Sequence, residues 1–148
     1  MSCYENLVER ARNLSEIAHA NQLRKNGEPY FFHPERVSNN MYSDIGKAAA
    51  YLHDVLEDTI FTEKDFIDHQ IPNEVIEIVQ ILTKKPKENY LDYIIRVINS
   101  KNDLAIEIKE FDLKDNMSDL NESCLKDKYR FAEYLIDNYF EIKKYRPL

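Results

Sequence analysis

Glycine is scarce in this sequence, with only Gly27 and Gly46 among 148 residues. The glycine-rich loop of a dinucleotide-binding fold and the Walker A loop both need glycines at spacings that these two do not have, so both nucleotide cradles are excluded. The scarcity also disfavours a β-sandwich or β-barrel, whose many turns need left-handed positions that glycine fills. The composition therefore favours helices.

Cysteine is scarce too, because Cys3 and Cys124 stand far apart and form no C-x-x-C pair. Neither a zinc ribbon nor a disulfide framework is indicated, and a reducing cytoplasm is the expected location. The N-terminus carries Glu5, Glu9 and Arg10 where a signal peptide needs an apolar stretch, and no segment is apolar for about 18 residues. No association with a membrane is expected.

Basic residues are fewer than acidic ones, because the chain has 20 Lys and Arg and 27 Asp and Glu, which gives a net charge of −7. A groove for DNA or RNA needs a basic stripe to meet the phosphate backbone, and none is present, so neither is an expected partner. A small anionic substrate would need local positive charge. Hydrophobic residues make up 43% of the chain, enough for the core of one domain spanning residues 1–148.

Apolar residues recur at helical spacing along the chain and predict an all-α fold of about eight helices. Pro34 and Pro72 suit first helical turns, and Thr62 with Asp65 resembles a capping box. The expected helices cover approximately residues 7–22, 34–42, 44–57, 62–69, 72–82, 90–98, 103–120 and 126–143.

The third predicted helix combines an apolar surface on most sides with ionisable groups, which indicates that these groups are buried or half-buried. His53 and Glu57, and likewise Asp54 and Asp58, are four residues apart and would lie one turn from each other. A cation beside His53 and Asp54 would compensate the buried carboxylate. The helix alone equally fits a hydrogen-bonded core histidine followed by a solvated helix end.

Several short motifs occur in a distinctive order between residues 16 and 120. They are Ala18-His19, Arg24-Lys25, Gly27-Glu28-Pro29-Tyr30, His33-Pro34, Leu52-His53-Asp54-Val55-Leu56-Glu57-Asp58-Thr59, Leu82-Thr83-Lys84, and then Asp112 with Asn116. In this combination the chain resembles the HD-domain hydrolases of the RelA/SpoT group. The resemblance implies a helical HD fold that removes the 3′-pyrophosphate of the alarmone ppGpp or pppGpp.

The resemblance also implies one divalent metal ion, typically manganese, held by His33, His53, Asp54 and Asp112. A set of imidazoles and carboxylates without thiolates suits such an ion and leaves positions for water and a phosphate oxygen. His19 is expected to be a structural neighbour of this site rather than a further ligand.

Catalytic and substrate-binding roles are likewise carried over from the resemblance. Glu57 and Asp58 match the acidic pair that orients or deprotonates water. Arg24 matches an arginine that packs on the guanine ring, a role suited to its flat cation. The implied substrate contacts are Arg24, Lys25 and Asn116, with Tyr30 either lining the same pocket or packing in the loop.

Two positions depart from the family pattern. Asp115 stands where a histidine is common, and Asp119 where a threonine is usual, which adds negative charge near an anionic ligand. The departures leave the substrate open, so another nucleotide, such as NADPH with its 2′-phosphate, is an alternative. A non-catalytic module that binds metal or nucleotide is a third hypothesis. Because the chain ends at residue 148, we expect a small stand-alone hydrolase, whose oligomeric state the sequence leaves open.

Overall fold

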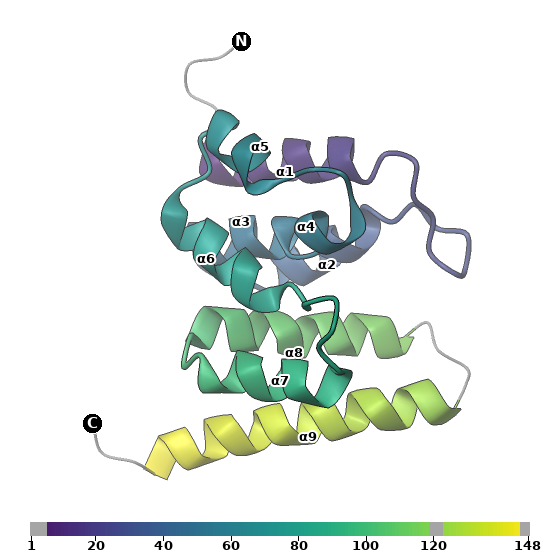
Figure 1. The fold of residues 1–148 in the computed structure, drawn as a ribbon, viewed down its shortest axis with the longest axis vertical. Coiled ribbons are helices and arrows are strands. Elements are labelled where there is room, and N and C mark those ends of the chain that lie inside the picture. Colours follow the sequence, from purple (N-terminus) through teal and green to yellow (C-terminus); the bar gives the residue numbers. More distant parts are fainter. Residues whose placement is uncertain (1–5, 119–122, 146–148) are drawn as a thin grey trace.

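A computed structural model describes residues 6–118 and 123–145 of the chain, and these residues form an all-α fold (Figure 1). Its regular elements are α1 (Leu7–Ala18), α2 (Phe32–Asn39), α3 (Asp44–Leu52), α4 (Val55–Asp58), α5 (Glu63–Asp68), α6 (Asn73–Leu82), α7 (Tyr90–Asn99), α8 (Asp103–Ser118) and α9 (Ser123–Tyr145). The only β pairing among the described residues is an isolated bridge between Leu23 and Pro29. The expected all-α fold class is confirmed.

Several helices begin at the residues that the sequence indicates as starting positions or caps. Thr62 precedes α5, and its N–H donates to the Asp65 carboxylate at 2.7 Å in the expected capping box. Pro72 occupies the N-cap of α6, just before the expected first turn. The Ser43 hydroxyl accepts from the N–H of Gly46 at 3.0 Å and so caps α3.

The predicted third helix over residues 44–57 is wrong in one respect, because it breaks into α3 and α4 at His53 and Asp54. The N–H of His53 points to the carbonyl oxygen of Ala50, three residues back, rather than four. The His53 ring also donates from Nδ1 to that same oxygen at 2.6 Å. This local bonding ends the regular α-helical ladder and turns the chain where two candidate site residues lie.

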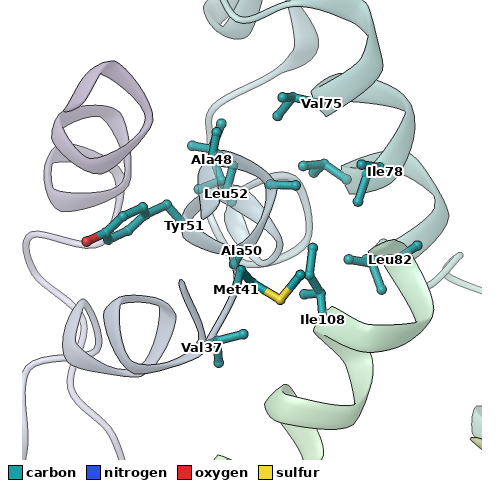
Figure 2. Packing of buried hydrophobic residues seen from close by; sticks show 14 of the residues in the cluster. Val37, Met41, Ala48, Ala50, Tyr51, Leu52, Val75, Ile78, Leu82 and Ile108 are labelled. Atoms are coloured by element: carbon teal, nitrogen blue, oxygen red, sulfur yellow. The ribbon is translucent and has the colours of Figure 1, made fainter. Parts of the chain in front are cut away.

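Helix α3 runs through the centre of the fold and packs against α1, α2, α6 and α8. Its Ala48, Ala50 and Leu52 side chains are fully buried, as the apolar pattern predicted. Figure 2 shows Leu52 facing Ile78 and the neighbouring residues of α6, with Ile108 approaching from α8. The small alanines let the neighbouring helices approach α3 closely.

The remaining helices differ from the prediction mainly at their ends. Helix α1 ends at Ala18, before the predicted residue 22, because His19 leaves the helical conformation as its C-cap. Helix α9 packs along α7 and α8 (Figure 1) and extends beyond the predicted residues 126–143 at both ends. No helix within residues 6–118 and 123–145 combines the length and apolar character needed to cross a membrane.

Candidate metal centre and its cavity

The four residues expected to ligate a metal come together from two helices and from the break between two others. His33 lies on α2, His53 and Asp54 form the break between α3 and α4, and Asp112 lies on α8. One potential ligand atom from each of these residues lies within 4.8 Å of all the others. We call this group the four-residue cluster.

The distances within the four-residue cluster are short. His33 Nε2 lies 2.9 Å from Asp112 Oδ1 and 3.5 Å from Asp54 Oδ2. His53 Nε2 lies 3.1 Å from Asp54 Oδ2 and 3.4 Å from Asp112 Oδ1. Within the described residues, neither Nε2 atom has a hydrogen-bond partner, although both are buried.

The other ring nitrogen of each histidine is engaged, which determines how the ring is oriented. His33 Nδ1 donates to Asp115 Oδ2 at 2.6 Å, and His53 Nδ1 donates to the carbonyl oxygen of Ala50 at 2.6 Å. Both acceptors lack a proton to donate, so Nδ1 carries the hydrogen in each ring. In the neutral rings, the Nε2 lone pairs therefore face the two carboxylates.

The pKa shifts in the four-residue cluster show that its environment favours positive charge. Burial by itself would lower the pKa of His53, but Asp54 and Asp112 outweigh burial and raise that pKa to about 10. Burial would raise the pKa of Asp112, whereas Lys109, followed by His33 and His53, holds it well below its usual range. The carboxylates therefore stay ionised, and their negative charge favours a cation beside the two buried histidines.

These observations fit a divalent metal ion. Ligand atoms that share one ion at about 2.1 Å lie roughly 3 Å apart when they are adjacent, and the measured separations within the cluster are of this size. Unpartnered, buried Nε2 atoms beside ionised carboxylates are the donor set that a metal would satisfy. The assignment of His33, His53, Asp54 and Asp112 as ligands stays a prediction.

The acidic pair of α4 lies beside the cluster. Single carboxylate oxygens of Asp54, Glu57 and Asp58 lie within 4.8 Å of one another, and Glu57 and Asp58 are exposed. Although both residues are exposed as a whole, partial desolvation of their carboxyl groups and the charge of Asp54 raise the pKa of Asp58 to about 6 and also raise that of Glu57. Tyr30 donates its hydroxyl to Asp54 Oδ2 at 2.6 Å, which fixes this carboxylate from the side of the 24–30 loop. The predicted catalytic roles of Glu57 and Asp58 remain predictions.

A cavity of about 240 Å³ opens above the cluster and the acidic pair. Sequence reasoning missed most of its basic and aromatic lining, because α7 and α9 reach the site only through tertiary packing. Lys109 was detectable in principle, since it lies three residues before Asp112 on α8. The lining consists of Tyr30, Asp54, Glu57, Asp58, Lys84, Tyr90, Tyr93, Lys109, Asp112, Asn116, Lys128 and Tyr129.

Only some of the expected substrate contacts line the cavity. Asn116 lines the cavity and donates from Nδ2 to Asp112 Oδ1 at 3.0 Å. The Arg24 side chain is only 8% exposed and donates to Asp115 Oδ2 at 2.6 Å and to Asn116 Oδ1 at 3.2 Å. Lys25 lies exposed in its loop and is not part of the cavity lining. The base-stacking role of Arg24 stays a prediction, and Asp119 lies outside the described residues.

His19 is buried close to the site, as expected of a structural neighbour. Its ring packs on that of Tyr30 with 4.8 Å between centroids. Gln22 donates from Nε2 to the carbonyl oxygen of Asp58 at 2.7 Å and faces His19 Nδ1 with its amide oxygen at 2.8 Å. His19 is thereby connected to α4 but is not among the groups whose ligand atoms converge.

The helical fold, with two histidines and two aspartates converging from α2, α8 and the break between α3 and α4, is of the HD-domain class. No family model matches the chain. A solved structure described as a metazoan ortholog of SpoT that hydrolyses ppGpp matches with a TM-score of 0.68 and 20% identity, over 97% of this chain and 98% of its own. This likeness supports the fold.

Curated bacterial relatives are similar to the chain in sequence as well. A GTP pyrophosphokinase rsh from Brucella suis is 31% identical over 91% of this chain and 20% of its own length. A probable guanosine-3′,5′-bis(diphosphate) 3′-pyrophosphohydrolase from Mycoplasma pneumoniae is 28% identical over 92% of this chain and 21% of its own. The chain thus spans about a fifth of the length of these relatives. The expected resemblance to the RelA/SpoT-type HD-domain proteins is confirmed.

Proposed function

We propose that the protein hydrolyses the 3′-pyrophosphate of ppGpp or pppGpp, releasing pyrophosphate and GDP or GTP, with a divalent metal ion, manganese, held by the four-residue cluster. The observation that carries this proposal is the convergence of two buried imidazoles and two carboxylates beside an acidic pair at one cavity. The names of the relatives support the substrate, because one is named a probable guanosine-3′,5′-bis(diphosphate) 3′-pyrophosphohydrolase and the matched solved structure is described as hydrolysing ppGpp.

A divalent ion held by the cluster would polarise a phosphoryl oxygen as a Lewis acid and would lower the pKa of water. In this proposal, Asp58 and Glu57 orient the attacking water and take its proton. A carboxylate with a pKa of about 6, raised by burial and by Asp54, is largely ionised near neutral pH and still basic enough to accept that proton. The hydroxyl of Tyr30 holds Asp54 in place through its hydrogen bond.

Binding of the substrate requires positive charge in a protein that is acidic overall. Lys84, Lys109 and Lys128 all line the cavity, and Lys84 lies beside Glu57, whose Oε1 accepts from the backbone N–H of Lys84 at 2.9 Å. Because Asp54, Glu57, Asp58 and Asp112 line the same cavity, the lysines would attract a phosphorylated ligand together with the divalent ion, whose charge offsets these carboxylates. Tyr90 and Tyr129 offer aromatic surface in the same cavity.

A second candidate is an HD phosphohydrolase that acts on a different nucleotide, such as NADPH at its 2′-phosphate. The observation that favours it is that Arg24 donates hydrogen bonds to Asp115 and Asn116. The side chain expected to contact guanine is therefore already bound within the protein. The four-residue cluster and the acidic pair would serve this reaction equally well.

The test is release of pyrophosphate from ppGpp by the purified chain with added Mn²⁺, repeated with EDTA and with D54A. Release that disappears with EDTA and in D54A supports the proposal. D68A is the matched control, because Asp68 is an exposed aspartate that pairs with Lys64 on α5, and it should retain full activity. Metal binding without release contradicts the proposed reaction.

Substrate choice needs a panel of ppGpp, pppGpp, GTP and NADPH at equal concentration. Preferred cleavage of ppGpp or pppGpp rejects the second candidate. Cleavage of another member alone replaces the first proposal with the second, whereas a protein that binds metal yet cleaves none behaves as a non-catalytic module.

A further inference from the structure

Asp115 on α8 receives hydrogen bonds from three cationic or potentially cationic side chains. His33 Nδ1 and Arg24 Nη1 both donate to its Oδ2 at 2.6 Å. Arg36 donates from Nε to Oδ1 at 2.7 Å and from Nη2 to Oδ2 at 3.1 Å. The Asp115 side chain is 13% exposed, so these are charge-assisted contacts in a largely desolvated place.

The imidazole of His33 lies between two carboxylates of the same helix. Its Nε2 faces Asp112, while its Nδ1 bonds Asp115, three residues further along α8. Residues three apart lie on the same helical face, so α8 contacts both sides of this ring. His33 itself is 1% exposed, which leaves the ring little freedom to turn.

We infer that Asp115 is a positioning residue for the metal centre, which keeps the hydrogen of His33 on Nδ1 and presents Nε2 to the ion. A carboxylate behind a metal-binding histidine fixes the tautomer and increases the basicity of the ligating nitrogen. The inference rests on the metal site of the proposed function and adds to it a group outside the four-residue cluster.

Asp115 is itself held in place by the two arginines. Arg36 extends from Asp115 to Glu28, to which it donates from Nη1 and Nη2 at 2.8 and 3.0 Å. Arg24 extends from Asp115 to Asn116, which in turn donates to Asp112 Oδ1. The 24–30 loop, α2 and α8 are thus joined behind His33, and a carboxylate at position 115 is the common acceptor. An uncharged residue at this position would leave both guanidinium groups without their shared counter-charge.

The test compares Mn²⁺ dissociation constants, measured by calorimetric titration of the metal-stripped full chain, for the wild type, D115N and E110Q. Asparagine keeps the size of the side chain and removes its charge. We expect D115N to bind Mn²⁺ roughly 10- to 100-fold more weakly, the usual effect of losing such a partner. E110Q is the matched control on α8, where Glu110 forms an ion pair with Lys114, and it should bind like the wild type.

The outcomes separate this inference from the proposed function. A D115N constant within about twofold of the wild type overturns the inference while leaving the metal site intact. A wild type that binds no divalent ion overturns the metal site and the inference together. A role confined to neutralising Arg24 and Arg36 would lower the unfolding temperature of the metal-free protein without changing the Mn²⁺ constant, and this result also counts against the inference.

A measurement on the wild type keeps the inference testable if D115N does not fold. In the zinc-loaded protein, long-range proton–nitrogen NMR correlations report which ring nitrogen of His33 carries hydrogen. We expect hydrogen on Nδ1, with its proton signal shifted downfield by the carboxylate of Asp115. Hydrogen on Nε2, or metal on Nδ1, would overturn the assignment.

Discussion

The buried ammonium group of Lys109 provides the sharpest test of the electrostatics of the site. It lies 2.7 Å from Asp112 Oδ2, its side chain is 10% exposed, and it packs over the rings of Tyr90 and Tyr93. Replacing it in K109M keeps most of the apolar stem and leaves Asp112 without its buried counter-charge. Removing one partner of a buried ion pair costs about 3–5 kcal/mol of unfolding free energy.

A metal ion in the four-residue cluster would return positive charge to Asp112 in K109M. In the metal-free protein, we expect the unfolding temperature to fall by about 6–20 °C, since each kcal/mol corresponds to about 2–4 °C in a domain of this size. With saturating Mn²⁺ the loss should be clearly smaller, because the ion stabilises both proteins on binding and in K109M also replaces the missing charge beside Asp112. K114M is the matched control: Lys114 lies on the same helix, but its pair with Glu110 is exposed and contributes at most about 1 kcal/mol.

Thermal unfolding of the wild type, K109M and K114M, each with EDTA and with Mn²⁺, measures these effects. Equal losses for K109M in both conditions would refute the reasoning, because the ion would then not share the charge balance of Asp112. A loss for K109M no larger than that for K114M would refute the assignment of Lys109 as a buried counter-charge.

Three further predictions concern the stability of the fold, each measured by urea unfolding. The Arg96 guanidinium bonds Glu88 and lowers the pKa of that carboxyl to about 2, so the stabilisation is present above its ordinary pKa and is lost as the pH falls. The advantage of the wild type over E88Q should therefore shrink between about pH 5 and pH 2, and a pH-independent difference would contradict this. L52A empties a fully buried position and should cost about 2–5 kcal/mol, whereas a loss below about 1 kcal/mol would show that neighbouring helices refill the space. S43A removes the cap of α3 and should cost about 1 kcal/mol, and an unchanged unfolding midpoint would mean that water replaces the cap.

Local signals in the sequence predicted most helices because the evidence for them lies within a few residues. The capping box at Thr62 and the buried alanines of α3 follow from side-chain chemistry and helical periodicity, and both are present in the structure. The break between α3 and α4 was missed because residues 44–57 are rich in good helix formers such as alanine and leucine. It depends on the His53 ring bonding back to Ala50, which helix propensity does not describe.

The residues of the candidate site also divide into those that sequence motifs indicate and those that only tertiary packing brings to the cavity. His33, His53, Asp54 and Asp112 could be named from their motifs, and the structure brings their ligand atoms within 4.8 Å of one another. The lysines and tyrosines that α7 and α9 contribute to the cavity carry no such motif. Their positions follow from which helix faces pack together, and many residues separate them along the chain.

The sequence by itself determined that the protein is helical, because helical periodicity is a local property. Its motifs, through their resemblance to the RelA/SpoT-type HD-domain proteins, named four residues as candidates to hold a metal. Only the tertiary structure decided the role of Asp115, which the sequence showed merely as a departure from the family pattern. Its contact with Arg24 spans 91 positions, and its contact with His33 spans 82. Contacts across such separations form only when the packing of α2 against α8 brings these charges together in a desolvated interior, where each needs a partner.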